Sequence, residues 1–168
     1  MAHWIDMEAQ EFFALVKEHF RFLFEKYGFA VVREEIGQSF DFSSIKIQSN
    51  SCSISIGRDR GDVTISLRPV SASYVGFSLG DIITFLERRS GTQDRVIWFG
   101  PEPKESLNYS DRIRFQLSWY ADKLRQYCDQ ILYLFQEDIF KQRQAELKAW
   151  RDFREKYILE AWRQAGKP

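Results

Sequence analysis

The side chains that most often act as nucleophiles, bases or metal ligands are scarce in this chain. It contains two histidines, His3 and His19, and two cysteines, Cys52 and Cys128, which lie far apart and belong to no CxxC pair. A structural zinc site takes four nitrogen or sulfur ligands, and a nucleophile needs a base within hydrogen-bonding reach. The glycine-rich phosphate-binding motifs and the GxSxG and HExxH signatures do not occur. We therefore predict no metal, no cofactor and no catalytic residue.

Charged side chains are abundant but balanced. Lys and Arg together number 24, as do Asp and Glu, so the formal net charge is zero. A chain without net charge has no overall field that would draw it to nucleic acid or to an anionic membrane. The carboxylate pairs Glu34–Glu35 and Glu137–Asp138 are adjacent in sequence and cannot face each other across a cleft as in glycosidases. We predict no nucleic-acid partner and no membrane partner.

Arg58, Asp59 and Arg60 mark the first candidate for recognition. Apolar residues alternate with polar ones at 52–56 and again at 63–67, on either side of a glycine-containing turn. This pattern predicts an antiparallel β-hairpin with the three charged residues at its tip. The tip is either a polar recognition loop or a soluble turn whose charges compensate one another.

The polar side of this hairpin is made almost entirely of small hydroxyl residues. Ser53, Ser55 and Thr64 fall on the face opposite the Ile and Val residues, because side chains alternate along a strand. This flat face is either a docking surface or the hydrated side of a sheet that is buried on one side only.

The C-terminal segment carries an aromatic-rich stripe that includes Trp150 and Tyr157, with Trp162 widening it. One core-facing helical stripe spans about 100°, and this segment holds more apolar residues than such a stripe accommodates. The surplus is covered by the protein's own sheet, by a second copy or by a different protein. Exposed Trp and Tyr residues are typical of interface hot spots.

Residues 92–109 show no periodicity and predict a loop, in which Trp98 is a candidate contact residue. The Arg95–Tyr109 region is the place where a small enzyme or a ligand-binding protein would carry its site, because loops carry function more often than strands do.

The elements that position these residues begin with a helix over Asp6–Tyr27, with Asp6 as its N-cap and Gly28 after its last turn. Strands are predicted at Ala30–Glu35 and Phe40–Gln48. The second strand changes the parity of its apolar residues, which predicts a bulge near Ser43–Ser44.

The second half of the chain is predicted to be helical. Ser78 and Asp81 form a capping-box signature that opens a short helix, which Gly91 closes. Periodic apolar residues then predict helices at Ser110–Phe135 and Ile139–Arg163, with one long bent helix as the alternative.

These elements predict an α+β fold: an N-terminal helix on a roughly four-stranded antiparallel sheet, a short middle helix and one long or two C-terminal helices. We expect a single domain over 1–168, divided into a helix-sheet-helix core (1–91), a loop (92–109) and a helical region (110–168).

The segment Ile54–Leu86 resembles small uncharacterised bacterial proteins of the immunity type. The text that carries the resemblance is ISIGRDRGDV at 54–63 and FSLGDIITFL at 77–86, preceded by Tyr27-Gly28-Phe29 at the end of the first helix. The resemblance implies a protein that binds another protein, and it assigns no functional residue.

The sequence therefore favours a non-enzymatic, cytosolic protein-interaction module, of the immunity type by resemblance. The chain starts with no signal-peptide pattern, and its two distant cysteines are typical of free thiols in a reducing cytoplasm. The alternatives are an enzyme or ligand-binding protein with its site in the 95–109 region, and a structural subunit that dimerises through the last helix.

Overall fold

Five strands form one antiparallel sheet in the order β1-β2-β3-β4-β5, so each strand pairs with its neighbours in sequence. The computed structural model describes residues 7–38, 41–72, 76–88, 99–102 and 106–166. The strands are β1 (Ala30–Ile36), β2 (Ser43–Gln48), β3 (Cys52–Asp59), β4 (Asp62–Pro69) and β5 (Phe77–Ser78). The α+β prediction is confirmed, with five strands instead of four. With only two residues, β5 is too short to show a strand pattern in the sequence.

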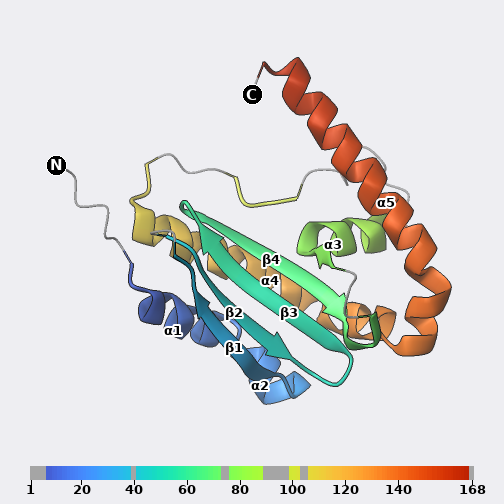
Figure 1. Ribbon diagram of the computed structural model, residues 1–168, viewed down its shortest axis with the longest axis horizontal. Coiled ribbons are helices and arrows are strands. Elements are labelled where there is room, and N and C mark those ends of the chain that lie inside the picture. The colour runs from blue at the N-terminus through green and yellow to red at the C-terminus, as the bar shows by residue number, and fades with distance from the viewer. Residues whose placement is uncertain (1–6, 39–40, 73–75, 89–98, 103–105, 167–168) are drawn as a thin grey trace.

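Three helices cover one face of this sheet and leave the other face open (Figure 1). They are α1 (Ala9–His19), α2 (Arg21–Tyr27) and α4 (Tyr109–Leu134). The core lies between the helices and the sheet, and its largest fully buried side chains include Phe12, Phe13, Phe20, Leu23, Ile45, Ile47, Ile54, Ile56 and Leu67. The apolar faces of β2, β3 and β4 therefore point toward α1 and α4.

The β3–β4 hairpin follows its alternating sequence. Ile54 pairs with Leu67 and Ile56 with Ile65, and all four side chains are buried. Thr64 and Ser66 are exposed on the opposite face. The alternation alone thus predicted the buried and the open side of the hairpin correctly.

Three local predictions in the first half of the chain are wrong. The first helix begins at Ala9 with Glu8 as its N-cap, and not at Asp6. The bulge lies in β1, where the register shifts between Val31 and Arg33, and not at Ser43–Ser44. The parity change has another cause: β2 begins at Ser43, so Phe42 precedes the strand. The predicted first helix is also broken at Phe20, whose ψ of 18° separates α1 from α2. Gly28 closes α2 with a φ of +69°, in the left-handed region that favours glycine.

The remaining helices lie beside the β5 edge of the sheet. α3 (Leu79–Glu87) begins with the predicted capping box of Ser78 and Asp81. α5 (Glu137–Gln164) is separate from α4, since the chain leaves the helical conformation at Phe135–Gln136, so the two-helix prediction is confirmed. The predicted end of the short helix at Gly91 lies outside the described residues. No helix within the described ranges has the length and apolar content needed to cross a membrane.

Candidate functional site

Arg58 lies inside the protein and not at an exposed hairpin tip. Only 4% of its surface is accessible, because position 58 falls on the core face of β3. Its Nε donates a hydrogen bond to Ser43 Oγ at 2.7 Å, and its guanidinium lies over the Phe12 ring at 5.3 Å. Asp59 and Arg60 are exposed and lie close to each other, with 3.8 Å between Arg60 Nε and Asp59 Oδ1. Of the three candidate residues at the tip, only these two are available to a partner.

The hairpin tip is fastened to the start of α4. Gln116 Oε1 accepts from the Val63 backbone N–H at 2.9 Å, and Gln116 Nε2 donates to the Gly61 carbonyl at 2.8 Å. Asp41 accepts from the Gly61 N–H at 3.0 Å and from the Tyr109 hydroxyl. Burial, and then the Asp41 carboxylate, raise the pKa of Tyr109. The tip is therefore a structural junction, made by residues too distant in sequence for local patterns to reveal.

The open face of the sheet carries the predicted hydroxyl residues. Ser55 lies opposite Ser66 and is half-buried, while Thr64 is exposed. Ser53 is 2% exposed even though it shares this face, and its Oγ has no hydrogen-bond partner among the described residues. This face is flat and polar.

A buried ion pair fastens α5 to the first turn of α3. Arg154 Nη1 lies 2.6 Å from Asp81 Oδ1, and both side chains are less than a tenth exposed. Asp81 Oδ2 also accepts from the Ser78 backbone N–H at 2.9 Å, so one carboxylate caps α3 and holds α5. One turn earlier, Trp150 Nε1 donates to Thr84 Oγ1 at 3.0 Å. Trp150 is consequently half-buried against α3.

Beyond this ion pair, α5 carries exposed apolar side chains. Every side chain from 155 to 164 is exposed or half-exposed. Four large apolar residues of this part of the helix are 44–52% exposed: Phe153, Tyr157, Leu159 and Trp162. The end of α5 extends past the sheet (Figure 1). We call residues 153–164 the distal part of α5. It holds two of the predicted contact residues, Tyr157 and Trp162.

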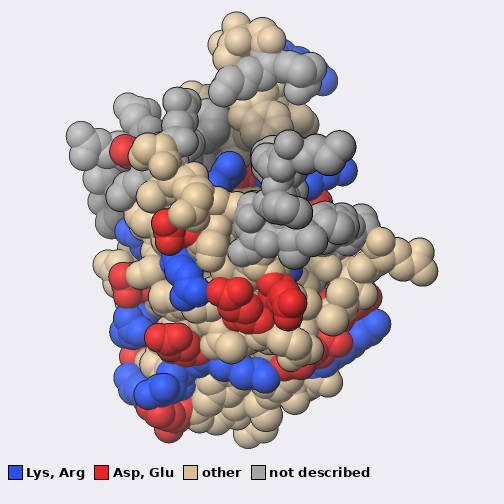
Figure 2. Space-filling model, turned by 90° about the vertical axis from the view of Figure 1, so that its left-hand side faces the viewer, with Lys and Arg blue, Asp and Glu red and all other residues tan. Residues whose placement is uncertain are grey.

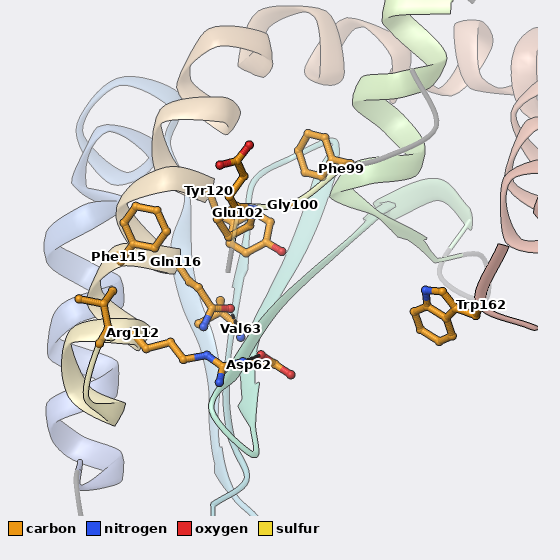
Figure 3. A pocket seen from close by; sticks show the side chains of 12 residues that line it. Asp62, Val63, Phe99, Gly100, Glu102, Arg112, Phe115, Gln116, Tyr120 and Trp162 are labelled. Carbon is orange, nitrogen blue, oxygen red and sulfur yellow. Dashed lines mark hydrogen bonds and ion pairs between the residues drawn. The ribbon is translucent and has the colours of Figure 1, made fainter. Parts of the chain in front are cut away.

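The predicted alternative site is marked by a half-open cavity of about 420 Å³. The Phe99–Glu102 segment forms one wall, and α4 contributes the rings of Phe115 and Tyr120 (Figure 3). At its polar edge, Arg112 Nη2 lies 2.5 Å from Asp62 Oδ1. Trp162 stands across the cavity from the α4 side chains. The cavity combines aromatic walls with charges of both signs.

The two cysteines are unsuited to nucleophilic chemistry. Both are buried free thiols. Burial raises the pKa of Cys128 to about 12 and that of Cys52 as well, so both thiols are protonated at neutral pH. In the described part of the chain, no group of three or more His, Cys, Asp and Glu residues is placed to hold a metal ion.

The predicted site residues do not form one cluster. Ser53, Ser55 and Thr64 lie on the open face of the sheet, whereas Tyr157 and Trp162 lie on the distal part of α5. Trp98 lies outside the described residues. Comparison with family models, with curated proteins and with solved structures finds no match to this chain.

Proposed function

We propose that the protein is a non-enzymatic binding module that inserts the distal part of α5 into an apolar groove of another protein. The observation that carries the proposal is the exposure of Phe153, Tyr157, Leu159 and Trp162 on one projecting helix. Tyr and Trp side chains in such positions are enriched among the residues that dominate binding energy. Monomeric proteins rarely expose contiguous apolar patches of more than a few hundred Å².

The distribution of these side chains around the helix indicates the shape of the partner. At about 100° per residue, the apolar side chains from Phe153 through Tyr157 and Ile158 to Leu159 span about 240° of the circumference. A single helix packed alongside would cover a stripe of about 100°. The partner must therefore enclose α5 from more than one side, which is the helix-in-groove mode of recognition.

The ion pair of Arg154 and Asp81 supports this role. It anchors α5 to the body of the protein beside Phe153 and about one turn before Tyr157. Because the helix is held at its base, it does not have to become ordered on binding, and preorganised elements bind at a lower entropic cost. The resemblance of Ile54–Leu86 to immunity-type proteins implies a toxin as the partner.

The proposal is tested by site-specific photo-crosslinking in the cells that make this chain. A photoreactive phenylalanine analogue, benzoylphenylalanine, replaces Tyr157 or Trp162 in turn. Tyr133, an α4 residue that is 59% exposed, provides the matched control position. We expect one other protein to be crosslinked from both α5 positions and not from the control. Mass spectrometry should map the crosslinks to an apolar groove of that protein.

Three outcomes would contradict the proposal. The first is an absence of crosslinks from both α5 positions. The second is crosslinking only to a second copy of the chain, which would favour the structural-subunit alternative. The third is the same product from Tyr133 as from Tyr157, which would indicate a contact that does not depend on α5.

The cavity beside Phe99–Glu102 favours a second candidate function, the binding of a small ligand. Its volume of about 420 Å³ lies within the range of small-molecule sites. The Tyr120 ring, with Arg112 and Asp62 at the rim, suits a zwitterionic aromatic compound. Saturation-transfer NMR with free phenylalanine as the probe tests this function, and Arg112→Met should remove the signal. No transfer, or transfer that persists in the variant, would contradict it.

A further inference from the structure

The first strand of the sheet has an exposed edge. Within the described part of the chain, β1 pairs with β2 on one side and with no strand on the other, and all seven of its residues are exposed. Three of them are large apolar residues: Val31 is 40% exposed, Val32 55% and Ile36 61%. An edge strand presents unpaired backbone N–H and C=O groups to any strand that approaches it. β1 therefore offers both backbone hydrogen bonds and apolar side chains.

The opposite edge of the sheet is different. β5 has two residues and leads directly into α3, which packs beside it. Very short strands and covering helices are the usual protection of a sheet edge. The free edge of this sheet is thus the one formed by β1.

We infer that two copies of the chain pair antiparallel through β1, in the register that places Glu34 opposite Glu34 of the second copy. A two-fold axis perpendicular to the sheet relates antiparallel edge strands of identical chains. In such a pair, directly opposed side chains point to the same face of the sheet. Two opposed residues of identical strands are therefore an even number of positions apart, so one residue always lies opposite its own copy. The inference rests on the edge strand and not on the function proposed for α5.

The charges of β1 complement themselves in this register. Arg33 lies opposite Glu35 of the second copy, and the symmetry repeats this pair. Both residues belong to the open face, since Arg33 pairs with Lys46 and Glu35 with Ser44 within the sheet. Opposite charges in directly opposed positions stabilise antiparallel strands. Within one chain, Arg33 Nη2 and Glu35 Oε1 already lie 3.4 Å apart, so their side chains extend along the same surface.

The helix-covered side of the strand is also compatible with this register. Ile36, whose neighbour across the sheet is the buried Ser43, lies at the end of this register beside the bulge at Val31–Arg33 of the second copy. Both Ile36 and the bulged Val32 are more than half exposed in the monomer, so pairing covers apolar surface there. The central Glu34 carboxylate is held by Lys17 Nζ of α1 at 2.6 Å. Because each copy supplies its own lysine, the two facing glutamates do not bring two uncompensated charges together.

The neighbouring registers are less favourable. Centring the pair on Arg33 would place two guanidinium groups opposite each other. Centring it on Glu35 would oppose two carboxylates and leave Arg33 opposite Gly37 of the second copy. Like charges in directly opposed positions destabilise strand pairing. The register centred on Glu34 also opposes two carboxylates, but each of these lies 2.6 Å from the Lys17 ammonium of its own copy. It is also the one of the three registers that places Arg33 opposite Glu35 twice, so it is the most favourable of the three.

Charged residues on edge strands usually prevent association. Here the two charged residues of the open face, Arg33 and Glu35, have opposite signs, so that they permit pairing with an identical strand. Acidic and basic side chains are interleaved over this side of the molecule (Figure 2). β1 and α5 lie at opposite edges of the sheet (Figure 1). A pair formed through β1 therefore leaves both α5 helices accessible.

Charge reversal tests the inference directly. In Arg33→Glu, both opposed pairs of positions 33 and 35 consist of two acidic residues. In Glu35→Arg, both pairs consist of two basic residues. We expect sedimentation equilibrium to show a dimer for the wild-type chain and a dissociation constant at least about tenfold higher for each variant alone. A mixture of the two variants should form a heterodimer, since both pairs of positions 33 and 35 then carry opposite charges.

Two controls separate this interface from others. Arg21→Glu, on α2, reverses a charge whose side chain is 68% exposed and should leave the dimer intact. Tyr157→Ser, on α5, should also leave it intact. Far-ultraviolet circular dichroism checks that each variant is folded. A wild-type chain that is monomeric at every concentration would overturn the inference, as would dimers that survive both charge reversals or a mixture that fails to associate.

Discussion

Removal of the Arg154 guanidinium should destabilise the whole protein, although the residue lies on the last helix. In the variant Arg154→Met, Asp81 keeps its hydrogen bond from the Ser78 N–H but loses Arg154 Nη1 at 2.6 Å. Its carboxylate, 5% exposed, is then a buried charge without a counterion. Breaking a buried pair by removing one partner costs about 3–5 kcal/mol.

Urea unfolding followed by circular dichroism measures this loss. With a denaturant dependence of about 2 kcal/mol per molar, the midpoint should fall by roughly 2 M at unchanged slope. The double variant Asp81→Asn/Arg154→Met should recover part of the loss, because it leaves no buried charge. Lys156→Met, an exposed position two residues further along α5, should stay within about 0.5 kcal/mol of the wild type.

A free energy of unfolding of Arg154→Met within about 1 kcal/mol of the wild-type value would contradict this prediction. That result would mean that the carboxylate is solvated in solution and that α5 is not fastened to α3.

Two further predictions concern residues that the sequence did not single out. Gln116→Ala leaves the Val63 N–H and the Gly61 carbonyl without their α4 partner. The free energy of unfolding should fall by about 1–3 kcal/mol, and the Val63 amide should exchange its hydrogen faster. An unchanged exchange rate would contradict the described junction. Burial and the Glu87 carboxylate raise the pKa of Tyr127 to about 12, above the ordinary value of about 10, so its contribution to stability is complete below pH 10 and is lost as the pH rises from 10 to 12. Tyr127→Phe should therefore flatten the loss of stability over that interval, and an equally steep profile would contradict this pKa shift.

The sequence predicted several elements that depend on a local pattern. The hairpin, the capping box of Ser78 and Asp81 and the glycine after α2 each depend on residues a few positions apart. Such patterns set which face of a strand is buried and where a helix begins. The count of strands failed at β5, because its two residues are too few to alternate.

The role of Arg58 was not predictable in this way. Counting two residues along β3 from Ile56 places position 58 on the core face, yet an arginine that opens the charged run Arg58-Asp59-Arg60-Gly61-Asp62 is typical of an exposed turn. Its burial depends on Ser43 and Phe12, which lie 15 and 46 positions away in sequence. The Gln116 junction is hidden for the same reason.

The exposed surfaces were also only partly predictable from the sequence. The sequence indicated an excess of apolar residues on the last helix, but only the structure shows that the excess lies from Phe153 onward, where the helix projects. The edge position of β1 follows from the strand order, which no local pattern contains.

The most direct test of the proposed function is the affinity of the purified crosslinked partner for the intact chain and for its Tyr157→Ser variant. Removing a hot-spot aromatic residue costs about 2 kcal/mol or more of binding free energy, so the dissociation constant should rise at least about thirtyfold. Tyr133→Ser, which removes a still more exposed ring outside α5, should leave the dissociation constant unchanged. Equal affinities for the wild type and Tyr157→Ser, or an equal loss in both variants, would contradict the role assigned to the distal part of α5.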